Sequence, residues 1–599
     1  MDPISDRPAR WRHEWLLWAL AFSALRLLLA ASFCDVFVYG EEFEKAAAGK
    51  ALLDRVPIAT HLLPYHPYEG GGFVISLLDA LAFSLVGESV LALKLVAIAL
   101  GVAILALGWK FCERFAGRAS ARAFALLYLL APESVQTNSL LALGIHYQAC
   151  LFVGAILYLA LRASIGREAR GGLWVVLGIV AGLGFYVSYQ CALTIAVAGG
   201  LLLLAWKREL FRARLAWAVV GALIGLTPLV WMALNVGIAV FDIHGASLVG
   251  GDKPKLELLG AFWTSLTEGR AWFDRLALVL LLLTPAAALL ALRGAESRAY
   301  RWTVGTLAAH ILVFVGVYLA SGFTVGRVLH YFYLHRLMPL WFLAALLCAV
   351  AVARLRWLWI PIALLAALGL VDTLRLVRDA APADMRANLA TLAREKGYRY
   401  SQYLQKIEPR LPGTRPEKLD VLLNCRESEP ELLHESLAIA LYGWGEGSFE
   451  AMCGEIRAAG VEDLRGFELG MGLMLMRHKS RDFGERIAHV SGLEAPVRDA
   501  LIESIGRFGQ WELGTEDTVL REVQAGVDAG FPEPFFRGLG RRLQLSLGDA
   551  RIRHYFERHS SPAFLSHDKV RALIGEMPES ARSAVLAGYE HARRLHRLP

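Results

Sequence analysis

Three carboxylates come directly after the first long apolar run of the chain. The run spans 15–33, and Asp35, Glu41 and Glu42 follow it in the stretch DVFVYGEEFEKAAAGK. Carboxylates at a membrane surface are poorly solvated, and such groups can be tuned to act as general bases. The same stretch also fits a solvated helix in which Glu41 and Lys45 form an i,i+4 ion pair. The residues therefore indicate either a catalytic base or an exposed helix beside the membrane.

Basic and imidazole side chains inside the apolar runs are a second group of candidates. Arg26 lies in the second half of the first run, and Lys94 lies near the start of another run. Ionisable groups inside a bilayer are expensive, so they usually face a cavity or an anionic partner. The alternative for Lys94 is that its long stem carries the ammonium to the interface. His146, in GIHYQAC, is either a further binding residue or a packing residue whose hydrogen bonds are satisfied within the bundle.

Two loop segments bring aromatic and cationic side chains. The segment HLLPYHPYEGGG at 61–72 contains Tyr65 and His66. The segment GRVLHYFYLHRLMPL at 326–340 gathers four donors before one of the last apolar runs: Arg327, His330, His335 and Arg336. Arginine prefers bidentate contact with phosphate oxygens, which favours an anionic ligand over simple anchoring at the interface.

Together these residue types suit the transfer of a group from a lipid phosphate. Cations hold the phosphate of the donor and neutralise the leaving group, while a carboxylate deprotonates an acceptor hydroxyl. The candidate bases are Glu42, Glu41 and Asp35. The candidate ligands of the substrate or of its lipid phosphate are Arg26, Lys94, Arg327, Arg336, His330, Tyr65, His66 and His146. The seven cysteines show no CxxC pair, and no metal ligand is assigned.

The composition is that of a multi-pass membrane protein. The 599 residues are 56% hydrophobic, and the mean hydropathy is +0.44. A single soluble core cannot absorb so much apolar surface. The formal net charge of +7 would fit a nucleic-acid-binding protein, but the basic residues lie in short loops between apolar runs, as membrane topology requires. No nucleic-acid partner is therefore expected. The first run is not expected to be a cleaved signal peptide, because it contains Arg26 and lacks a small-residue cleavage site.

Eleven apolar runs are predicted to cross the membrane as helices. They lie near 15–33, 90–109, 120–135, 139–161, 173–189, 191–206, 216–239, 276–292, 302–319, 337–352 and 357–374. The positive-inside rule places the basic loops in the cytoplasm, namely the N-terminus, 110–122, 162–170, 207–214, 293–301 and 354–356. For this parity to hold, the short run Gly72–Val86, which contains Asp79, lies along or dips into the outer face. The loop 34–89 is then external, and so is everything after about residue 376.

The last part of the chain, 377–599, is polar, rich in helix formers and free of spanning runs. A glycine motif recurs in it, at 441–447, 468–474, 504–510, 537–543 and 586–592. This recurrence suggests stacked helical hairpins with close glycine contacts, in the manner of α-solenoids. A plain helical domain whose helices end at glycine caps is the alternative. We therefore predict an all-α fold, with a transmembrane helix bundle over 1–376 and a soluble helical domain over 377–599.

The order of these features resembles the GT-C superfamily of polyprenyl-phosphate-sugar-dependent glycosyltransferases. The likeness is to bacterial relatives of the family 39 protein O-mannosyltransferases and of the lipid A aminoarabinose transferase, and it covers about residues 12–375. The motifs that carry it are GEEFEKAAAG (40–49), PYEGGGFVISLLDALAFSLVGESVLALKL (67–95) with Lys94 at the basic position, GLGFYVSYQ (182–190), GLTPLVWMALN (225–235) and YFYLHRLMPL (331–340). The acidic pair of the family reads Glu41-Glu42 here, with Asp35 displaced by six residues, so the base is not assigned to one of the three.

The resemblance implies a GT-C bundle in the bacterial inner membrane, with the C-terminal domain on the periplasmic side. It implies transfer of a sugar from a polyprenyl-phosphate donor to a glycan, lipid or protein acceptor on that side, with inversion at the anomeric carbon. Some members use a divalent cation and others none, and no DxD triplet decides between them here. The rival hypothesis is a non-enzymatic transporter of lipid-linked glycans or a cell-envelope assembly subunit. A transporter would show internal repeats and broken helices, and the halves of 12–375 show no convincing repeat.

Overall fold

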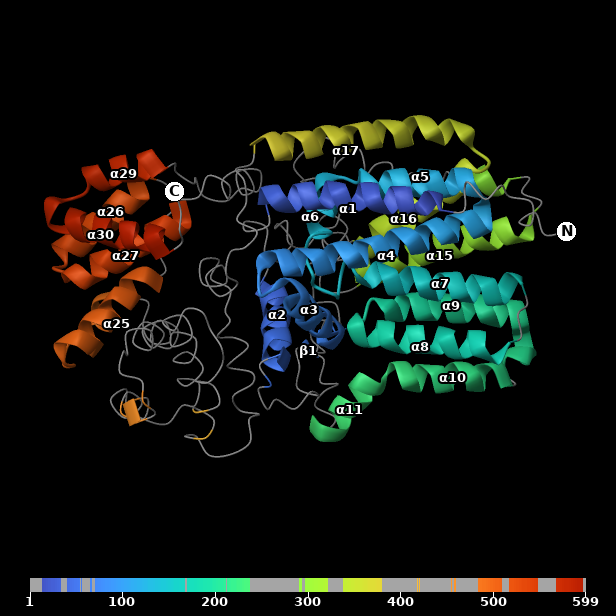
Figure 1. Cartoon of the computed structure of the whole chain (residues 1–599), viewed down its shortest axis with the longest axis horizontal. Coiled ribbons are helices and arrows are strands. Elements are labelled where there is room, and N and C mark those ends of the chain that lie inside the picture. Colours follow the sequence, from blue (N-terminus) through green and yellow to red (C-terminus); the bar gives the residue numbers. More distant parts are fainter. Residues whose placement is uncertain are drawn as a thin grey trace. The chain divides into compact units, whose positions relative to one another are not determined.

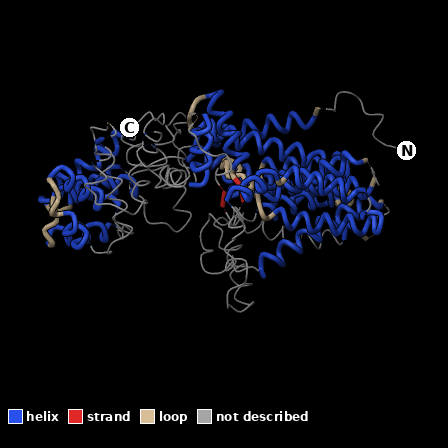
Figure 2. The backbone as a smooth tube through the Cα atoms, turned by 90° about the horizontal axis from the view of Figure 1, so that it is seen from below, coloured by secondary structure: helices blue, strands red, loops and turns tan. Residues whose placement is uncertain are grey.

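The structure is a computed structural model of the chain. It describes 13–33, 40–53, 65–66, 70–166, 170–211, 213–236, 290–293, 297–320, 338–379, 483–508, 516–547 and 567–595, with a few single residues between these ranges. Nearly all the regular structure in them is helical, so the predicted all-α fold is confirmed. The strands described are β1 (Tyr65–His66) and β2 (Gly70–Gly71), which pair antiparallel with Tyr65 opposite Gly71. Figure 2 shows this small ladder in red among the blue helices.

The chain divides into two compact units, which are described separately. The first, the membrane unit, contains Met1–Phe37, Leu63–Ala82 and Leu91–Met385. The second unit contains Val38–Leu62, Phe83–Val90 and Arg386–Pro599. The stretch with Glu41 and Glu42 thus belongs to the second unit. The predicted domain limits, 1–376 and 377–599, stay predictions.

The membrane unit is a bundle of apolar helices (Figure 1). Within the described residues, five helices are long and apolar enough to cross a membrane. They are α1 (Glu14–Phe33), α4 (Val90–Ala116), α9 (Cys191–Trp206) with η3 (Lys207–Phe211), α15 (Arg298–Ala320) and α17 (Trp359–Asp379) with η7 (Arg356–Leu358). The pair α10 (Ala213–Gly225) and α11 (Thr227–Val236) passes the same test but bends by 59°. Shorter helices of the unit are α3 (Phe73–Val86), whose last turn from Phe83 is counted with the second unit, α5 (Arg118–Leu129), α6 (Glu133–Asn138), α7 (Ala149–Ile165), α8 (Gly171–Val187) and α16 (Met338–Val352). The total of eleven crossings stays a prediction, and the predicted helix 276–292 lies outside the described residues except at its end.

Three of the predicted crossings are not continuous helices. The helix predicted at 120–135 ends at Leu129, and α6 begins only at Glu133. The helix predicted at 139–161 begins only at Ala149, because residues 139–148 are buried but not helical. Gly144 in this stretch has a φ of +80°, a left-handed conformation that a right-handed helix excludes. The helix predicted at 216–239 bends between α10 and α11, where Thr227 and Pro228 stand. Proline has no N–H to continue the helix, and the Thr227 hydroxyl donates instead to the carbonyl of Ile224 at 2.6 Å.

The described basic loops of the membrane unit, at 110–122, 207–211 and 354–356, are called the basic connections below. They lie together at one end of the bundle, the end where α1 starts (Figure 1). Arg122 near the start of α5 forms an ion pair of 2.7 Å with Glu14 at the start of α1. Arg354, which follows α16, donates to the carbonyl of Arg293 at 3.5 Å. The positive-inside rule requires this arrangement if the end is cytoplasmic. The helices α3 and α11 lie at the opposite end of the bundle (Figure 1).

Facing glycines bring α8 and α10 into backbone contact. Gly178 and Gly182 form a GxxxG pair on α8, and Gly221 and Gly225 form another on α10. A Cβ atom at any of the four would lie under 3.0 Å from a backbone carbonyl of the other helix. Small residues are needed at such interfaces because helices in lipid associate through close packing rather than through a hydrophobic force. This pairing was not predicted from the sequence.

The second unit contains a layer of three packed helices. Its described helices are α2 (Gly40–Leu53), α24 (Phe483–Val490), α25 (Ala495–Phe508), α26 (Glu516–Asp528), α27 (Glu533–Leu547), α29 (His567–Glu576) and α30 (Glu579–Leu595). The layer consists of α25, α27 and α30, which bury Ile505, Leu539 and Val585. A buried ion pair of 2.9 Å between Arg541 and Glu503 joins α27 to α25.

Glycines also set the spacing within this layer. A Cβ atom at Gly506 or Gly538 would lie under 3.0 Å from a carbonyl across the α25–α27 pair, and the same holds for Gly540 and Gly588 across the α27–α30 pair. The structure therefore shows close glycine contacts in the motifs at 504–510, 537–543 and 586–592. The motifs at 441–447 and 468–474 lie outside the described residues. Solenoid stacking stays a prediction.

The variant Gly538→Ala is expected to destabilise the second unit, because the added methyl group overlaps the carbonyl of Glu503. Overpacking costs about 1–3 kcal/mol, and a backbone neighbour cannot rotate away. The control is Gly575→Ala on α29, where nothing lies within 4 Å of the added Cβ. Thermal unfolding of the full chain, followed by circular dichroism, should shift to lower temperature for Gly538→Ala alone. Equal midpoints for the two variants would contradict the close contact.

Candidate functional site

Arg26 is fully buried in the membrane unit and is the centre of a polar network. Its guanidinium donates to the Ser139 hydroxyl at 2.6 Å and to the side-chain carbonyl of Gln136 at 3.2 Å. It also donates to the backbone carbonyls of Leu129 at 3.3 Å and Tyr128 at 3.5 Å. These acceptors lie at the end of α5, in α6 and directly after α6. The contacts give Arg26 a structural role, and the phosphate contact predicted for it stays a prediction.

Gln136 extends this network from α6 to α17. Its amide donates to the carbonyls of Ala131 at 2.7 Å and Gly369 at 3.2 Å. Its side-chain oxygen accepts from the Thr373 hydroxyl at 3.0 Å. Gly369 is also a point of close approach, because a Cβ atom there would lie under 3.0 Å from the carbonyl of Leu130. The network thus joins α1, α6 and α17.

Residues 130–148, called the interrupted segment below, link α5 to α7 and are helical only in α6. In a membrane, non-helical backbone is tolerated only where it is buried in protein or lines a water-filled cavity. Here a glutamine side chain replaces missing helical hydrogen bonds: Gln148 donates to the carbonyl of Leu141 at 2.5 Å and accepts from the N–H of Gly144 at 2.9 Å. Arg26 and Gln136 do the same at the other end of the segment. The segment is therefore held in one conformation by polar side chains.

The interrupted segment packs against α3 and α4. Ile75 of α3, Ala97 of α4 and Ala142 of the segment belong to one apolar cluster, which fixes the faces that meet. Asp79 lies one helical turn after Ile75, and Lys94 lies one turn before Ala97. Both charged side chains are fully buried. They therefore lie on the helix faces that meet this cluster.

His146 and Ser76 are buried on the same elements, His146 on the interrupted segment and Ser76 on α3. Gly144, two residues before His146, packs so closely on α3 that a Cβ atom there would lie 2.6 Å from the Ile75 side chain. The four residues Ser76, Asp79, Lys94 and His146 are called the buried polar group below. It combines an ammonium, an imidazole, a hydroxyl and a carboxylate. An ammonium and an imidazole N–H are suitable donors for a phosphate.

The glycine triplet of the first loop is placed by Tyr186. A Cβ atom at Gly71 would lie under 3.0 Å from the Tyr186 ring, so the strand β2 lies directly on the end of α8. Tyr186 in turn packs with Leu229 and Met232 of α11 and with Phe73 at the start of α3. The loop that carries Tyr65 and His66 is therefore fixed to the end of the bundle where α3 begins. A side chain at position 71 would force the Tyr186 ring to move.

Several predicted site residues lie outside the described parts of the chain. They are Asp35, the side chain of Glu41, the side chains of Tyr65 and His66, and the residues Arg327, His330 and Arg336. Of the three candidate bases, the structure thus describes only the side chain of Glu42, which is fully buried in α2 of the second unit. In the membrane unit, it brings Lys94 and His146 onto neighbouring elements. No group of three His, Cys, Asp or Glu side chains that could hold a metal ion occurs in the described ranges.

Gln136 was not predicted as a site residue, although the sequence contains a signal for it. The stretch PESVQTNS at 132–139 is polar and interrupts an apolar region. Such a break indicates that a predicted crossing is not a plain helix. Asp79 was noted as a single acid in the short run at 72–86, but its packing against the interrupted segment requires the three-dimensional structure.

The variant Arg26→Met is expected to destabilise the membrane unit, because the Ser139 hydroxyl, the Gln136 side-chain oxygen and the Tyr128 carbonyl lose a buried donor. Each buried acceptor left unsatisfied costs about 1–3 kcal/mol. The control is Arg122→Met, which removes an ion pair whose arginine side chain is 44% exposed. Exposed pairs contribute about 0–1 kcal/mol.

The readout is the reaction of a thiol-reactive dye with buried cysteines, among them Cys112, Cys150 and Cys191, during heating in detergent. Arg26→Met should expose these thiols at a clearly lower temperature than Arg122→Met does. Identical exposure temperatures would show that the Arg26 network does not hold the bundle together.

Part of the membrane unit is similar in sequence to a known protein family. Residues 66–232 match the model of a family described as dolichyl-phosphate-mannose-protein mannosyltransferase. No curated protein and no solved structure matches the chain. The matched region begins after the acidic stretch and includes α3, α4, the interrupted segment and the α8–α10 pair. The match supports a GT-C-type membrane glycosyltransferase that uses a polyprenyl-phosphate sugar donor.

Proposed function

We propose that this protein moves a sugar from a polyprenyl-phosphate donor to an acceptor hydroxyl at the outer face of a bacterial inner membrane. The observation that carries the proposal is the family match over 66–232. The matched region contains the neighbouring elements on which Lys94 and His146 are buried. Buried charge at the packing interface of apolar helices is costly unless it serves a ligand or a partner, which supports a binding role for this group.

Lys94 is the proposed ligand of the donor phosphate. Its ammonium is a compact point charge, which suits the negative charge that develops on the phosphate oxygen as the bond to the sugar breaks. His146 is proposed to donate a hydrogen bond to the same phosphate. Asp79 and Ser76 are buried on α3, which packs against the elements that carry these donors. Arg26 is proposed to act as a positioning residue, because it holds the interrupted segment on which His146 lies.

Glu42 is the proposed general base, with Glu41 and Asp35 as the other candidates. Its carboxylate takes the proton of the acceptor hydroxyl while that oxygen forms a bond to the anomeric carbon. The bond from this carbon to the phosphate oxygen breaks, and the polyprenyl phosphate leaves with the bonding electrons. Attack from the side opposite to the leaving phosphate inverts the anomeric carbon. General-base catalysis of this kind contributes about 10²–10⁴-fold to the rate.

A second candidate function is supported by the two helix breaks. The interrupted segment and the bend of 59° between α10 and α11 are discontinuous helices, which transporters use to build binding sites. A protein with these features could carry a lipid-linked glycan or present it to an assembly without chemical reaction. The two functions differ in whether the sugar changes its covalent partner.

The test is transfer of radiolabelled sugar from a panel of polyprenyl-phosphate donors to membrane extract by the purified protein. Lys94→Gln should lower turnover by about 100-fold or more, because one fixed donor to the developing charge is lost. The matched control is Lys110→Gln, which removes an exposed lysine from the same helix. Glu42→Gln should lower turnover by about 10²–10⁴-fold while binding of the donor persists. If it does not, Glu41→Gln and Asp35→Asn identify the base.

Two results would decide against this proposal. Donor binding without turnover by the wild-type protein, in the presence of every acceptor fraction, would favour the transport or assembly function. Equal turnover by Lys94→Gln and Lys110→Gln would exclude the buried polar group as the phosphate site.

A further inference from the structure

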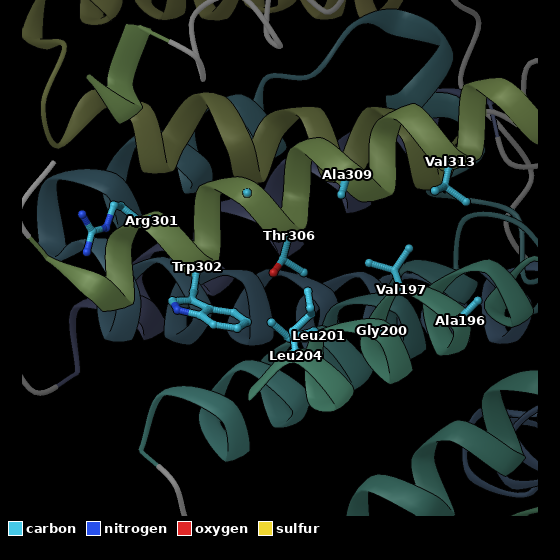
Figure 3. A pocket seen from close by; sticks show the side chains of 11 residues that line it. Ala196, Val197, Gly200, Leu201, Leu204, Arg301, Trp302, Thr306, Ala309 and Val313 are labelled. Atoms are coloured by element: carbon cyan, nitrogen blue, oxygen red, sulfur yellow. The ribbon is translucent and has the colours of Figure 1, made fainter. Parts of the chain in front are cut away.

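An apolar groove runs between α9 and α15, away from the buried polar group. Its volume is about 570 Å³, within the range of ligand sites. Figure 3 shows its walls: Leu201, Leu204 and Val197 from α9 face Trp302, Thr306 and Val313 from α15. The small residues Gly200 and Gly305 also line it, and a Cβ atom at either would meet nothing within 4 Å. The groove is therefore open at these two positions because glycine has no side chain to fill it.

The length of the groove matches one leaflet of a bilayer. Its lining residues on α15 extend from Arg301 to Val313, which is about 18 Å at 1.5 Å per residue. The hydrocarbon core of a bilayer is about 30 Å thick, so one leaflet contributes about 15 Å. Arg301 lies in the first turn of α15, at the end with the basic connections. The groove thus extends from a membrane surface to about the middle of the bilayer.

The surface end of the groove is cationic. Arg301 is exposed and lines the groove directly. Arg298, also exposed, lies over the Trp302 ring at 5.8 Å from its centre. Toward Val313 the lining is apolar except for Thr306. A cation at the surface end and an apolar channel below it complement a molecule with an anionic head and a hydrocarbon tail.

We propose that this groove binds one anionic glycerophospholipid of the leaflet that adjoins the basic connections. The phosphate lies beside Arg301 and Arg298, and one acyl chain lies along Gly200, Gly305 and Val313. The site is independent of the proposed sugar donor site, which uses Lys94 and His146 on other helices. The lipid covers apolar surface between two membrane helices and fixes their spacing.

The variant Gly305→Leu tests this inference, because its side chain enters the groove and its Cβ atom meets nothing within 4 Å. The matched control is Gly316→Leu, on the same helix but outside the groove, where a Cβ also meets nothing within 4 Å. The delipidated full-length protein is titrated with phosphatidylglycerol, and bound lipid is counted by native mass spectrometry. Wild type and Gly316→Leu should each retain one tightly bound phosphatidylglycerol, and Gly305→Leu should lose it.

The headgroup is tested separately with Arg301→Gln and with phosphatidylcholine of the same acyl chains. Each basic residue near an anionic surface contributes a factor of about five, so Arg301→Gln should weaken phosphatidylglycerol binding by about fivefold. Phosphatidylcholine carries the same phosphate, but its choline cation offsets the negative charge. It should therefore bind wild type more weakly, and Arg301→Gln should weaken its binding by less than fivefold.

Four outcomes would overturn the proposal. Equal lipid retention by Gly305→Leu and Gly316→Leu would place the lipid elsewhere. Equal affinity for phosphatidylglycerol and phosphatidylcholine would show that the groove does not select an anionic headgroup. Preferential binding of a polyprenyl phosphate in competition would make the groove a site for the donor lipid. No bound lipid in the wild type would mean that another segment of the chain covers the groove.

Discussion

The guanidinium of Arg26 is the interaction on which the membrane unit depends. A backbone that leaves the helical conformation inside a bilayer loses hydrogen bonds that lipid cannot replace. Arg26 supplies donors to two carbonyls and two side chains at one end of the interrupted segment, and Gln148 supplies both a donor and an acceptor at the other. The segment is thereby free to carry His146 against α3 and α4 without becoming a helix. The buried guanidinium of Arg26 stabilises the non-helical backbone, and that backbone carries His146.

Both units solve the problem of close helix packing in the same way. In the membrane unit, glycines on α8 and α10 admit the carbonyls of the facing helix, and in the second unit glycines on α25, α27 and α30 do so. The physical reasons differ. Lipid provides no hydrophobic force between helices, so α8 and α10 need close contact to associate. In the second unit, apolar residues such as Leu539 also contribute, and the glycines set the distance at which they meet.

The sequence predicted the helices well where long apolar runs are uninterrupted, as in α1, α4, α9 and α16. It failed at 139–148, because the apolar residues around Leu141 resemble a helix and the decisive contacts come from Arg26, more than a hundred residues away. Lys94 and His146 were predicted as candidates from residue type and depth, and the structure places them on neighbouring elements. Gln136 was missed because its partners, Gly369 and Thr373, belong to α17. Local pattern cannot predict a hydrogen bond across such a separation.

The two glycines of α27 have a mechanical consequence. Gly538 and Gly540 are two residues apart, which is about 200° around a helix, so they face nearly opposite sides. One receives a carbonyl of α25 and the other a carbonyl of α30. Each contact is reciprocal, since Gly506 and Gly588 receive carbonyls of α27 in return. These interlocking glycine–carbonyl contacts oppose sliding of any one of the three helices along its neighbour. A tilt applied to α25 is therefore transmitted through α27 to α30, and the layer moves as one stiff plate.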